Sequence, residues 1–327
     1  MKKLLSSLAV IGLLISGGTA HAEPVAIKFS LGACPIGHPM VKAAEAFNKH
    51  IMEKSGGKYS ATILPAGTIG NFDTVFQGVQ MGSIHVAVET VSNLSTFYPE
   101  ISGLDLPYLF KDNETAKKYL AGDLFKAQMK DMEKKRPAID IIGACSAGFR
   151  YMCSKPEWKT LADLQHKKDR VSGNRLHVSA IKALGMNPTP TAAAEILSSL
   201  QQGVVDSVDA EIFWPPTARL YDVAKYYLKM DAMPVFYVTS ASTPWLKQLP
   251  EADRAMFIEA LDWYVGEANK IIAEEMKAVV SFLEKQGCVF HELSDADKAE
   301  AAKKTAGMVD NLRANQKAFY NTVKSSL

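Results

Sequence analysis

The sequence is poor in cysteine, with four among its 327 residues: Cys34, Cys145, Cys153 and Cys288. These are too few and too scattered for the disulfide framework of a small exported domain, so no such framework is expected. One bridge between Cys145 and Cys153, the nearest pair in sequence, remains open, and buried free thiols are the alternative. Cys34 lies close to His38, but no second pair of metal ligands follows nearby, and we predict no metal site.

An excess of charge of one sign is also missing. The 37 lysines and arginines nearly balance the 35 aspartates and glutamates, for a net charge of +2, and no basic block stands out. Because nucleic acid is recognised largely through basic patches, we predict no nucleic-acid partner. Beyond the first residues, no apolar run is long enough to span a bilayer. The 47% hydrophobic content is that of a globular chain with a sizeable core.

Common enzyme motifs are absent as well. The sequence contains no G-x-x-x-x-G-K-[ST] for nucleotide phosphates, no G-x-S-x-G nucleophile and no H-E-x-x-H zinc motif. Its seven histidines are spread singly along the chain. Catalysis needs a nucleophile with its base, a carboxylate pair or a metal cluster, so we expect a protein that is not an enzyme and uses no cofactor.

The chain begins with what the sequence predicts to be a signal peptide, residues 1–22. Two lysines follow the first methionine, an apolar stretch runs from Leu4 to Ile15, and Ala20-His21-Ala22 has the A-x-A pattern of a cleavage site. This order is typical of a secretory signal, because the apolar stretch is too short for a membrane anchor. We therefore expect an exported protein whose mature chain starts near Glu23.

Strand and helix patterns alternate along the mature chain. Periodicity and turn residues predict strands at 25–31, 59–64, 84–89 and 139–143, with helices at 41–51, after 71–73 and at 116–134. This alternation predicts an open α/β sheet whose ligand lies beyond the carboxyl ends of the strands. The alternation repeats from 148 to about 229, which indicates a second lobe.

One helix is expected to be unusually long. Residues 251–286 contain no proline and a single glycine, Gly266, and their apolar residues fall at helical intervals. The predicted helix exceeds the usual length in globular domains. A strand at 288–291 and helices at 295–323 complete the chain.

The most informative stretch runs from residue 148 to residue 211. It contains, in order, G-F-R at 148–150, T-L-A-D-L at 160–164, K-D-R-V at 168–171, L-G-M-N-P-T-P at 184–190, Glu195 and L-Q-Q-G-V-V-D at 200–206. Arg150 and Arg170 each lie in a β-type stretch, and a guanidinium at a strand end can hold a carboxylate or sulfonate through two parallel hydrogen bonds. An isolated arginine is more often a surface residue, but the ordered set of motifs favours a binding role.

This ordered set resembles the solute-binding subunit of tripartite ATP-independent periplasmic (TRAP) transporters, the DctP-type family. The resemblance extends from about Val25 to the C-terminus. In that family the arginine of K-x-R-V clamps the acid group of the ligand, and the resemblance carries this role over to Arg170. The arginine of the family's G-x-R motif corresponds to Arg150.

The resemblance implies a two-lobed periplasmic binding protein fold, with mixed sheets flanked by helices and a long helix spanning both lobes. Lobe 1 would comprise residues 23–147 and about 236–275, and lobe 2 residues 148–235 and about 276–327, with the ligand cleft between them. The implied function is that of a monomeric periplasmic receptor. It would capture a small organic acid anion, a carboxylate above all, and deliver it to the separate small and large membrane subunits. The same role for a sulfonate such as isethionate, or service to an ABC importer, are the alternatives.

Further residues are candidates for ligand binding, each with an ordinary packing or surface role as the alternative. They lie in loops after predicted strands or near the expected cleft: His38, Asn71, Glu89, Thr90, Arg175, Glu211, Phe213, Trp214 and Tyr237. Ala210 stands where many family members have a ligand-contacting asparagine, which leaves the distal end of the ligand open. Alanines at 192–194 leave the pocket size open too.

Overall fold

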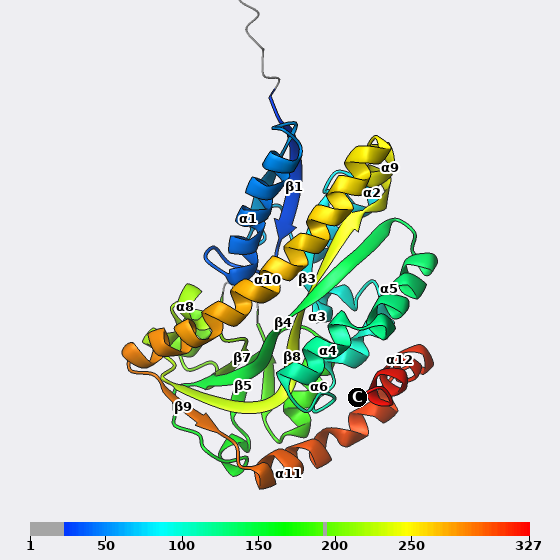
Figure 1. Ribbon diagram of the computed structural model, residues 1–327. Coiled ribbons are helices and arrows are strands. Elements are labelled where there is room, and N and C mark those ends of the chain that lie inside the picture. Colours follow the sequence, from blue (N-terminus) through cyan, green and yellow to red (C-terminus); the bar gives the residue numbers. More distant parts are fainter. Residues whose placement is uncertain (1–22, 192–194) are drawn as a thin grey trace, which may run out of the picture.

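In the computed structural model, residues 23–191 and 195–327 are described, and they form one mixed sheet covered by helices on both faces (Figure 1). The strands are β1 (Val25–Leu31), β2 (Tyr59–Pro65), β3 (Val86–Thr90), β4 (Ile139–Ser154), β5 (Lys168–Val171), β6 (Asn187–Pro190), β7 (Ser207–Ala210), β8 (Tyr226–Ser242) and β9 (Val289–Glu292). The helices of the first half are α1 (Pro39–Lys54), α2 (Phe72–Met81), α3 (Val91–Leu94), α4 (Asn113–Ala121) and α5 (Asp123–Lys135). Those of the second half are α6 (Arg175–Ala183), α7 (Ile196–Gln201), α8 (Trp214–Thr217), α9 (Thr243–Gln248), α10 (Glu251–Lys285), α11 (Asp295–Thr305) and α12 (Ala314–Lys324).

Two groups of parallel strands are joined by two long antiparallel strands. The strand order is β2-β1-β3-β8-β4-β7-β5-β6, and β9 pairs with β8. Strands β2, β1 and β3 are parallel, as are β7, β5 and β6, whereas β8 and β4 pair antiparallel with each other and with the flanking groups. The long strands therefore belong to both halves of the molecule, which positions the carboxyl ends of the two parallel groups on either side of a common centre.

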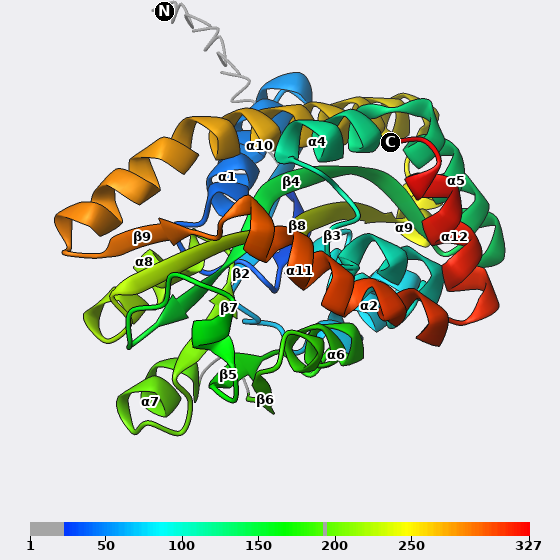
Figure 2. The same cartoon turned by 90° about the horizontal axis from the view of Figure 1, so that it is seen from below.

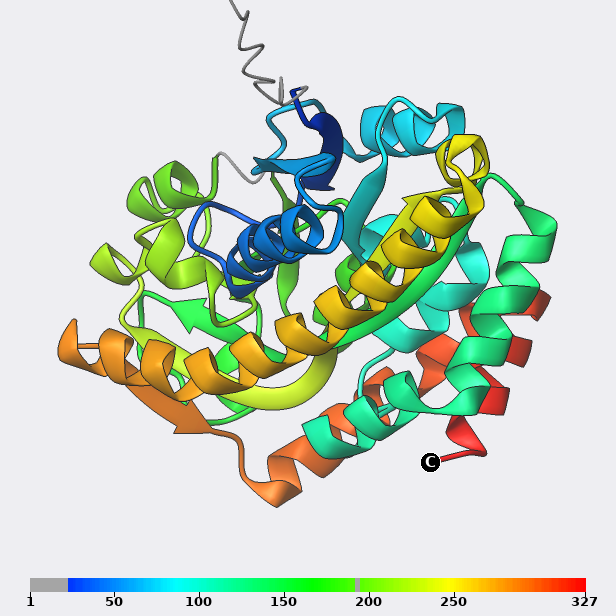
Figure 3. The same cartoon turned by 45° about the horizontal axis from the view of Figure 1, so that its top comes forward.

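Helix α10 is 35 residues long and crosses the molecule beside α1 (Figure 3). It begins and ends within a residue of the predicted limits, because no proline interrupts its backbone hydrogen bonds. Buried residues along it, among them Phe257, Leu261 and Tyr264, pack into a core shared with α1 and β1. The view from below shows α10 and α1 together along one side of the sheet, with α6, α2 and α11 away from them (Figure 2).

Two predicted elements differ from the structure. The helix expected at 116–134 is two helices, because Gly122 takes an extended conformation (φ −79°, ψ 162°) that ends α4 and precedes α5. The strand expected at 139–143 continues to Ser154 as β4, since the segment after Gly143 pairs with β8 as far as Ser154, with register shifts between Ser146 and Tyr151. Arg150 therefore lies within β4, in the β-type conformation that the sequence predicts.

The four cysteines are free and buried. Cys145 and Cys153 lie eight residues apart on β4, and at about 3.3 Å per residue their Cα atoms are far beyond the roughly 7 Å that a disulfide can span. The open alternative is thus decided in favour of free thiols. The predicted signal peptide, residues 1–22, lies outside the described residues. No helix of the described chain is long and apolar enough to cross a membrane.

Candidate functional site

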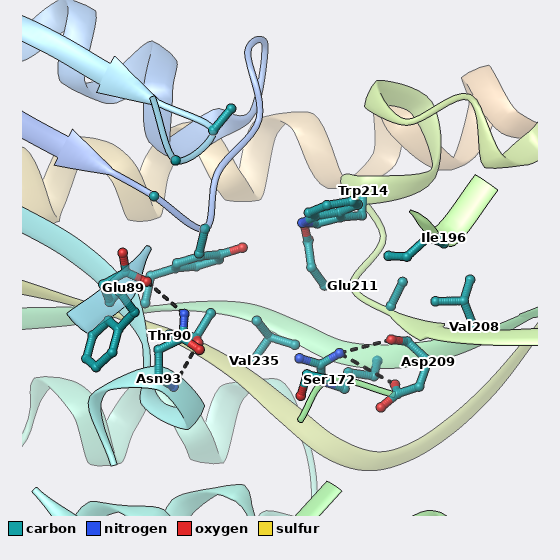
Figure 4. A pocket seen from close by; sticks show the side chains of 18 of the residues that line it. Glu89, Thr90, Asn93, Ser172, Ile196, Val208, Asp209, Glu211, Trp214 and Val235 are labelled. Carbon is teal, nitrogen blue, oxygen red and sulfur yellow. Dashed lines mark hydrogen bonds and ion pairs between the residues drawn. The ribbon is translucent and has the colours of Figure 1, made fainter. Parts of the chain in front are cut away.

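A cavity of about 430 Å³ lies between the two groups of parallel strands. Its walls come from the carboxyl ends of β1, β2, β3, β5 and β7, together with Val235 and Tyr237 of β8. Figure 4 shows Glu89, Thr90 and Asn93 on one side of this space and Asp209, Glu211 and Trp214 on the other. The cavity thus occupies the place where α/β sheets bind ligands, as the alternation of strands and helices predicts.

A bulge in β4 sets the position of Arg150. The register against β8 shifts between Ser146 and Phe149 and again before Tyr151, and Gly148 adopts φ +80°, which a glycine accepts without strain. Arg150 Nη1 donates to the backbone oxygen of Asp209 at 3.1 Å and lies 3.7 Å from its carboxylate Oδ1. The glycine of the G-F-R motif therefore has a structural reason, since it lets β4 bend where the arginine enters the cavity.

Arg170 enters the same cavity from β5. Its Nε and Nη2 donate to the backbone oxygen of Thr191, at 3.1 and 2.6 Å, so the side chain is held in place by a carbonyl and not by a carboxylate. Burial, and next the positive charge of Arg150, lower the pKa of Arg170 to about 10, which still leaves it protonated at neutral pH. Because the positive charges of Arg150 and Arg170 repel each other in one cavity, an anion bound there would be stabilised by both.

Two buried carboxyls lie behind the arginines. Burial raises the pKa of Asp209, and it raises that of Asp169 further, with Asp209 as the neighbouring charge. Ser207 Oγ donates to Asp169 Oδ1, while Arg150 lies beside Asp209. We therefore assign the negative charge of the pair to Asp209, which balances Arg150 and leaves the charge of Arg170 available to a ligand.

The opposite wall is formed by the end of β3 and the loop after β2. Asn93 Nδ2 donates to Glu89 Oε2 at 2.9 Å, and burial raises the pKa of the Glu89 carboxyl to about 7. Thr90 is the N-cap of α3, and Asn71 is the N-cap of α2, with its side-chain oxygen accepting from Thr74 N at 3.0 Å. These amide and carboxyl groups offer acceptors and donors for a polar ligand.

Glu211 follows β7 and lines the cavity next to Trp214 (Figure 4). His38 Nε2 lies 3.1 Å from Glu211 Oε1, although the two residues are 173 positions apart. Tyr237 lines the cavity and its hydroxyl lies 3.4 Å from the same His38 nitrogen.

The structure brings most of the predicted site residues to this cavity. Those that line it are Asn71, Glu89, Thr90, Arg150, Arg170, Glu211, Trp214 and Tyr237. His38 is fully buried behind the wall, and Phe213 packs edge-on against it at 5.5 Å. Arg175 begins α6 and is exposed outside the cavity, because Asn174 starts the helix there and turns the chain away. The alanines at 192–194 lie outside the described residues, whereas Ala210 lines the cavity.

Several lining residues were missed from the sequence. Ser172 lies two residues after Arg170, a spacing that places both on one face of an extended chain. Asn93 lies four residues after Glu89, close enough for the hydrogen bond between them. Both spacings could have been used, but Asp209 could not, because its contact with Arg150 depends on the pairing of β4 with β7. Among the described residues, no group of three or more His, Cys, Asp and Glu side chains could hold a metal ion.

Comparison with known proteins shows which family the chain belongs to. The profile of the family described as bacterial extracellular solute-binding protein, family 7 (DctP) matches residues 32–316. The 2,3-diketo-L-gulonate-binding periplasmic protein YiaO of Escherichia coli K12 is 26% identical over 248 residues, which cover 75% of this chain and 74% of that protein.

Solved structures agree in fold. A TRAP periplasmic solute-binding protein of Haemophilus influenzae with bound L-gulonate has a TM-score of 0.83 at 24% identity, covering 92% of this chain and 98% of the other. One from Shewanella oneidensis with bound succinate has a TM-score of 0.84 at 19% identity, covering 93% and 99%. These matches confirm the predicted two-lobed α/β fold. The chain belongs to the DctP family of periplasmic solute-binding proteins, the receptors of TRAP transporters.

Proposed function

We propose that this protein is the receptor of a TRAP transporter that captures a sugar acid, or a closely related hydroxylated monocarboxylate, and delivers it to membrane subunits. The observation that carries the proposal is the cavity at the carboxyl ends of two strand groups, with Arg150 and Arg170 on one side and polar acceptors on the other. The division into lobes 23–147 with about 236–275, and 148–235 with about 276–327, is part of the same proposal.

In this proposal the carboxylate of the ligand binds the guanidinium of Arg170. The charge of Arg150 is offset by Asp209, whereas the described contacts of Arg170 are to a backbone carbonyl, which leaves a positive charge to be matched. A guanidinium that is already oriented loses little freedom when it binds a carboxylate. Burial lowers the effective dielectric around the pair and strengthens its attraction.

The remainder of the ligand meets carboxyl and amide groups. Glu89, Asn93, Asn71 and Glu211 line the rest of the cavity, and hydroxyl groups can satisfy such acceptors and donors. A second carboxylate placed against Glu211 would instead face a like charge. The relatives support this reading in part, since the Haemophilus structure holds L-gulonate and the Escherichia protein is named for a diketo sugar acid.

The test is calorimetric titration of the purified protein with L-gulonate, succinate and isethionate, using the wild type, Arg170→Ala and Arg175→Ala. Charge-assisted hydrogen bonds contribute about 1.5–3 kcal/mol each, so losing two should weaken L-gulonate binding by a hundredfold or more in Arg170→Ala. Arg175→Ala should bind as the wild type does, because its side chain is exposed outside the cavity.

Undiminished binding by Arg170→Ala would contradict the arginine clamp. Tighter binding of isethionate or succinate than of L-gulonate would contradict the sugar-acid assignment and favour the sulfonate or the dicarboxylate instead.

A further inference from the structure

Glu211 is held from behind by two donors. His38 Nδ1 accepts a hydrogen bond from the backbone N–H of Met40 at 3.1 Å, so this ring nitrogen carries no proton. The proton of the neutral ring must then lie on Nε2, which donates to Glu211 Oε1 at 3.1 Å. The backbone N–H of Phe213 donates to Oε2 at 3.1 Å. Both oxygens of Glu211 therefore accept, which is the pattern of an ionised carboxylate.

The His38 side chain that holds this carboxylate is fixed in orientation and excluded from solvent. His38 has no exposed surface, and Phe213 and Tyr237 contact its ring edge-on at centroid distances of 5.5 and 5.3 Å. The ring cannot turn without breaking its bond to Met40 N. Glu211 itself is 4% exposed and lines the cavity beside Trp214, and each of its oxygens can accept a further hydrogen bond besides the one from His38 or Phe213.

We propose that Glu211, positioned by His38, is the residue that selects a hydroxylated monocarboxylate over a dicarboxylate of the same length. A ligand hydroxyl can donate to a carboxylate that is already fixed, at little further cost in conformational freedom. A second ligand carboxylate at the same place has no proton to donate and meets a like charge in a poorly solvated space. The inference rests on the proposed function, since it assumes that the acid group of the ligand lies at Arg170.

His38 comes from the loop after β1 and Glu211 from the segment after β7, so the pair joins the two strand groups behind the cavity wall. Glu211 lies one position beyond Ala210, which lines the same wall without a polar group. The polar contact at this end of the cavity therefore depends on Glu211, which lies outside the family motifs quoted from the sequence.

The experiment compares three acids of six carbons each: L-gulonate, which carries hydroxyls, adipate, which carries a second carboxylate, and 6-aminohexanoate, which carries an ammonium group. Calorimetric affinities are measured for the wild type, Glu211→Gln and His38→Asn. Glu211→Gln replaces one acceptor by an amide donor, so the ratio of the adipate Kd to the gulonate Kd should fall at least tenfold. His38→Asn keeps an oxygen that can accept from Met40 N but removes the donor to Glu211, so the ratio should fall in the same direction.

Glu157→Gln is the matched control, because Glu157 forms a comparable pair with His291, at 2.9 Å, on the exposed surface. It should leave the ratio unchanged. Far-UV circular dichroism of each variant verifies folding, and the ratio of two affinities does not respond to a general loss of stability. If the wild type binds none of the three acids, the proposed function fails. If it binds L-gulonate but neither Glu211→Gln nor His38→Asn changes the ratio, or 6-aminohexanoate binds more tightly than L-gulonate, the selection by hydroxyl groups fails while the receptor function stands.

Discussion

The chemistry of the buried Glu89 carboxyl depends on its place in the fold. In the sequence it is only the polar residue near the end of an apolar strand. In the structure it is 2% exposed and has one side-chain donor among the described residues, Asn93 Nδ2. Burial raises its pKa from the usual 4.5 to about 7, so near neutral pH the group changes charge inside the cavity. The ligand therefore meets a wall whose charge is set by burial.

This raised pKa predicts a pH effect on stability. Between pH 4.5 and pH 7 the folded state binds more protons at Glu89 than the unfolded state does, so the free energy of unfolding falls as pH rises through this window. The full effect of one such group is on the order of 3 kcal/mol. In ligand-free Glu89→Gln, urea unfolding measured at pH 5, 6, 7 and 8 should show a shallower fall than the wild type. Parallel curves for the two proteins would show that Glu89 ionises normally.

Helices in this protein contain glycines of two kinds, and their surroundings distinguish them. Gly266 lies within α10, and a Cβ added there would meet no atom within 4 Å. Gly78 lies within α2, and a Cβ there would come within 2.6 Å of Ile84 Cδ1, a buried side chain. The sequence shows both as glycines in helical patterns and does not separate them.

The same substitution at the two sites should therefore have opposite effects. Gly266→Ala should raise the free energy of unfolding by about 0.5–1 kcal/mol, because alanine restricts the unfolded chain and favours the helix. Gly78→Ala should lower it by about 1–3 kcal/mol through overpacking. Urea unfolding followed by circular dichroism measures both. A loss of stability in Gly266→Ala would indicate that α10 bends or packs at this point.

At the scale of the whole molecule, the two lobes share their cores. One hydrophobic cluster includes Phe76 and Ile181, and the other includes Phe47 and Leu200, so each draws on both of the proposed lobes. Strands β4 and β8 run through both strand groups in one continuous sheet. Neither lobe therefore has a core of its own that would remain intact if the other unfolded.

This shared core predicts a single cooperative unfolding transition. In the proposed division, Trp158 and Trp214 report on lobe 2, and Trp245 and Trp263 on lobe 1. Two double variants are needed, one with phenylalanine at the first pair and one with phenylalanine at the second. In each, the fluorescence transition should coincide with the far-UV circular dichroism transition of the same variant. A urea midpoint from fluorescence that differs from the midpoint from circular dichroism in the same variant would show that the lobes unfold separately.

The sequence by itself determined the family, the alternation of strands and helices, and the limits of α10. These features depend on local patterns: the two-residue period of a strand, the 3.6-residue period of a helix, and the order of short motifs. It also placed Arg150, Arg170 and Glu89 among the candidates, because polar residues at strand ends are recognisable along the chain. The break at Gly122 and the full length of β4 were missed, since an extended glycine and a long strand pairing are settled by neighbouring elements.

Only the tertiary structure decided which candidates meet. His38 and Glu211 are 173 positions apart, and no local pattern indicates that one donates to the other. Arg175 lies close to Arg170 in sequence but outside the cavity, because a helix begins there and directs its side chain to solvent. The protonation of the buried carboxyls also depends on the fold, since burial raises the pKa of Glu89 and of Asp169. Contacts between distant segments and the removal of water exist only once the chain is folded, which is why the sequence could name the arginines but not the complete site.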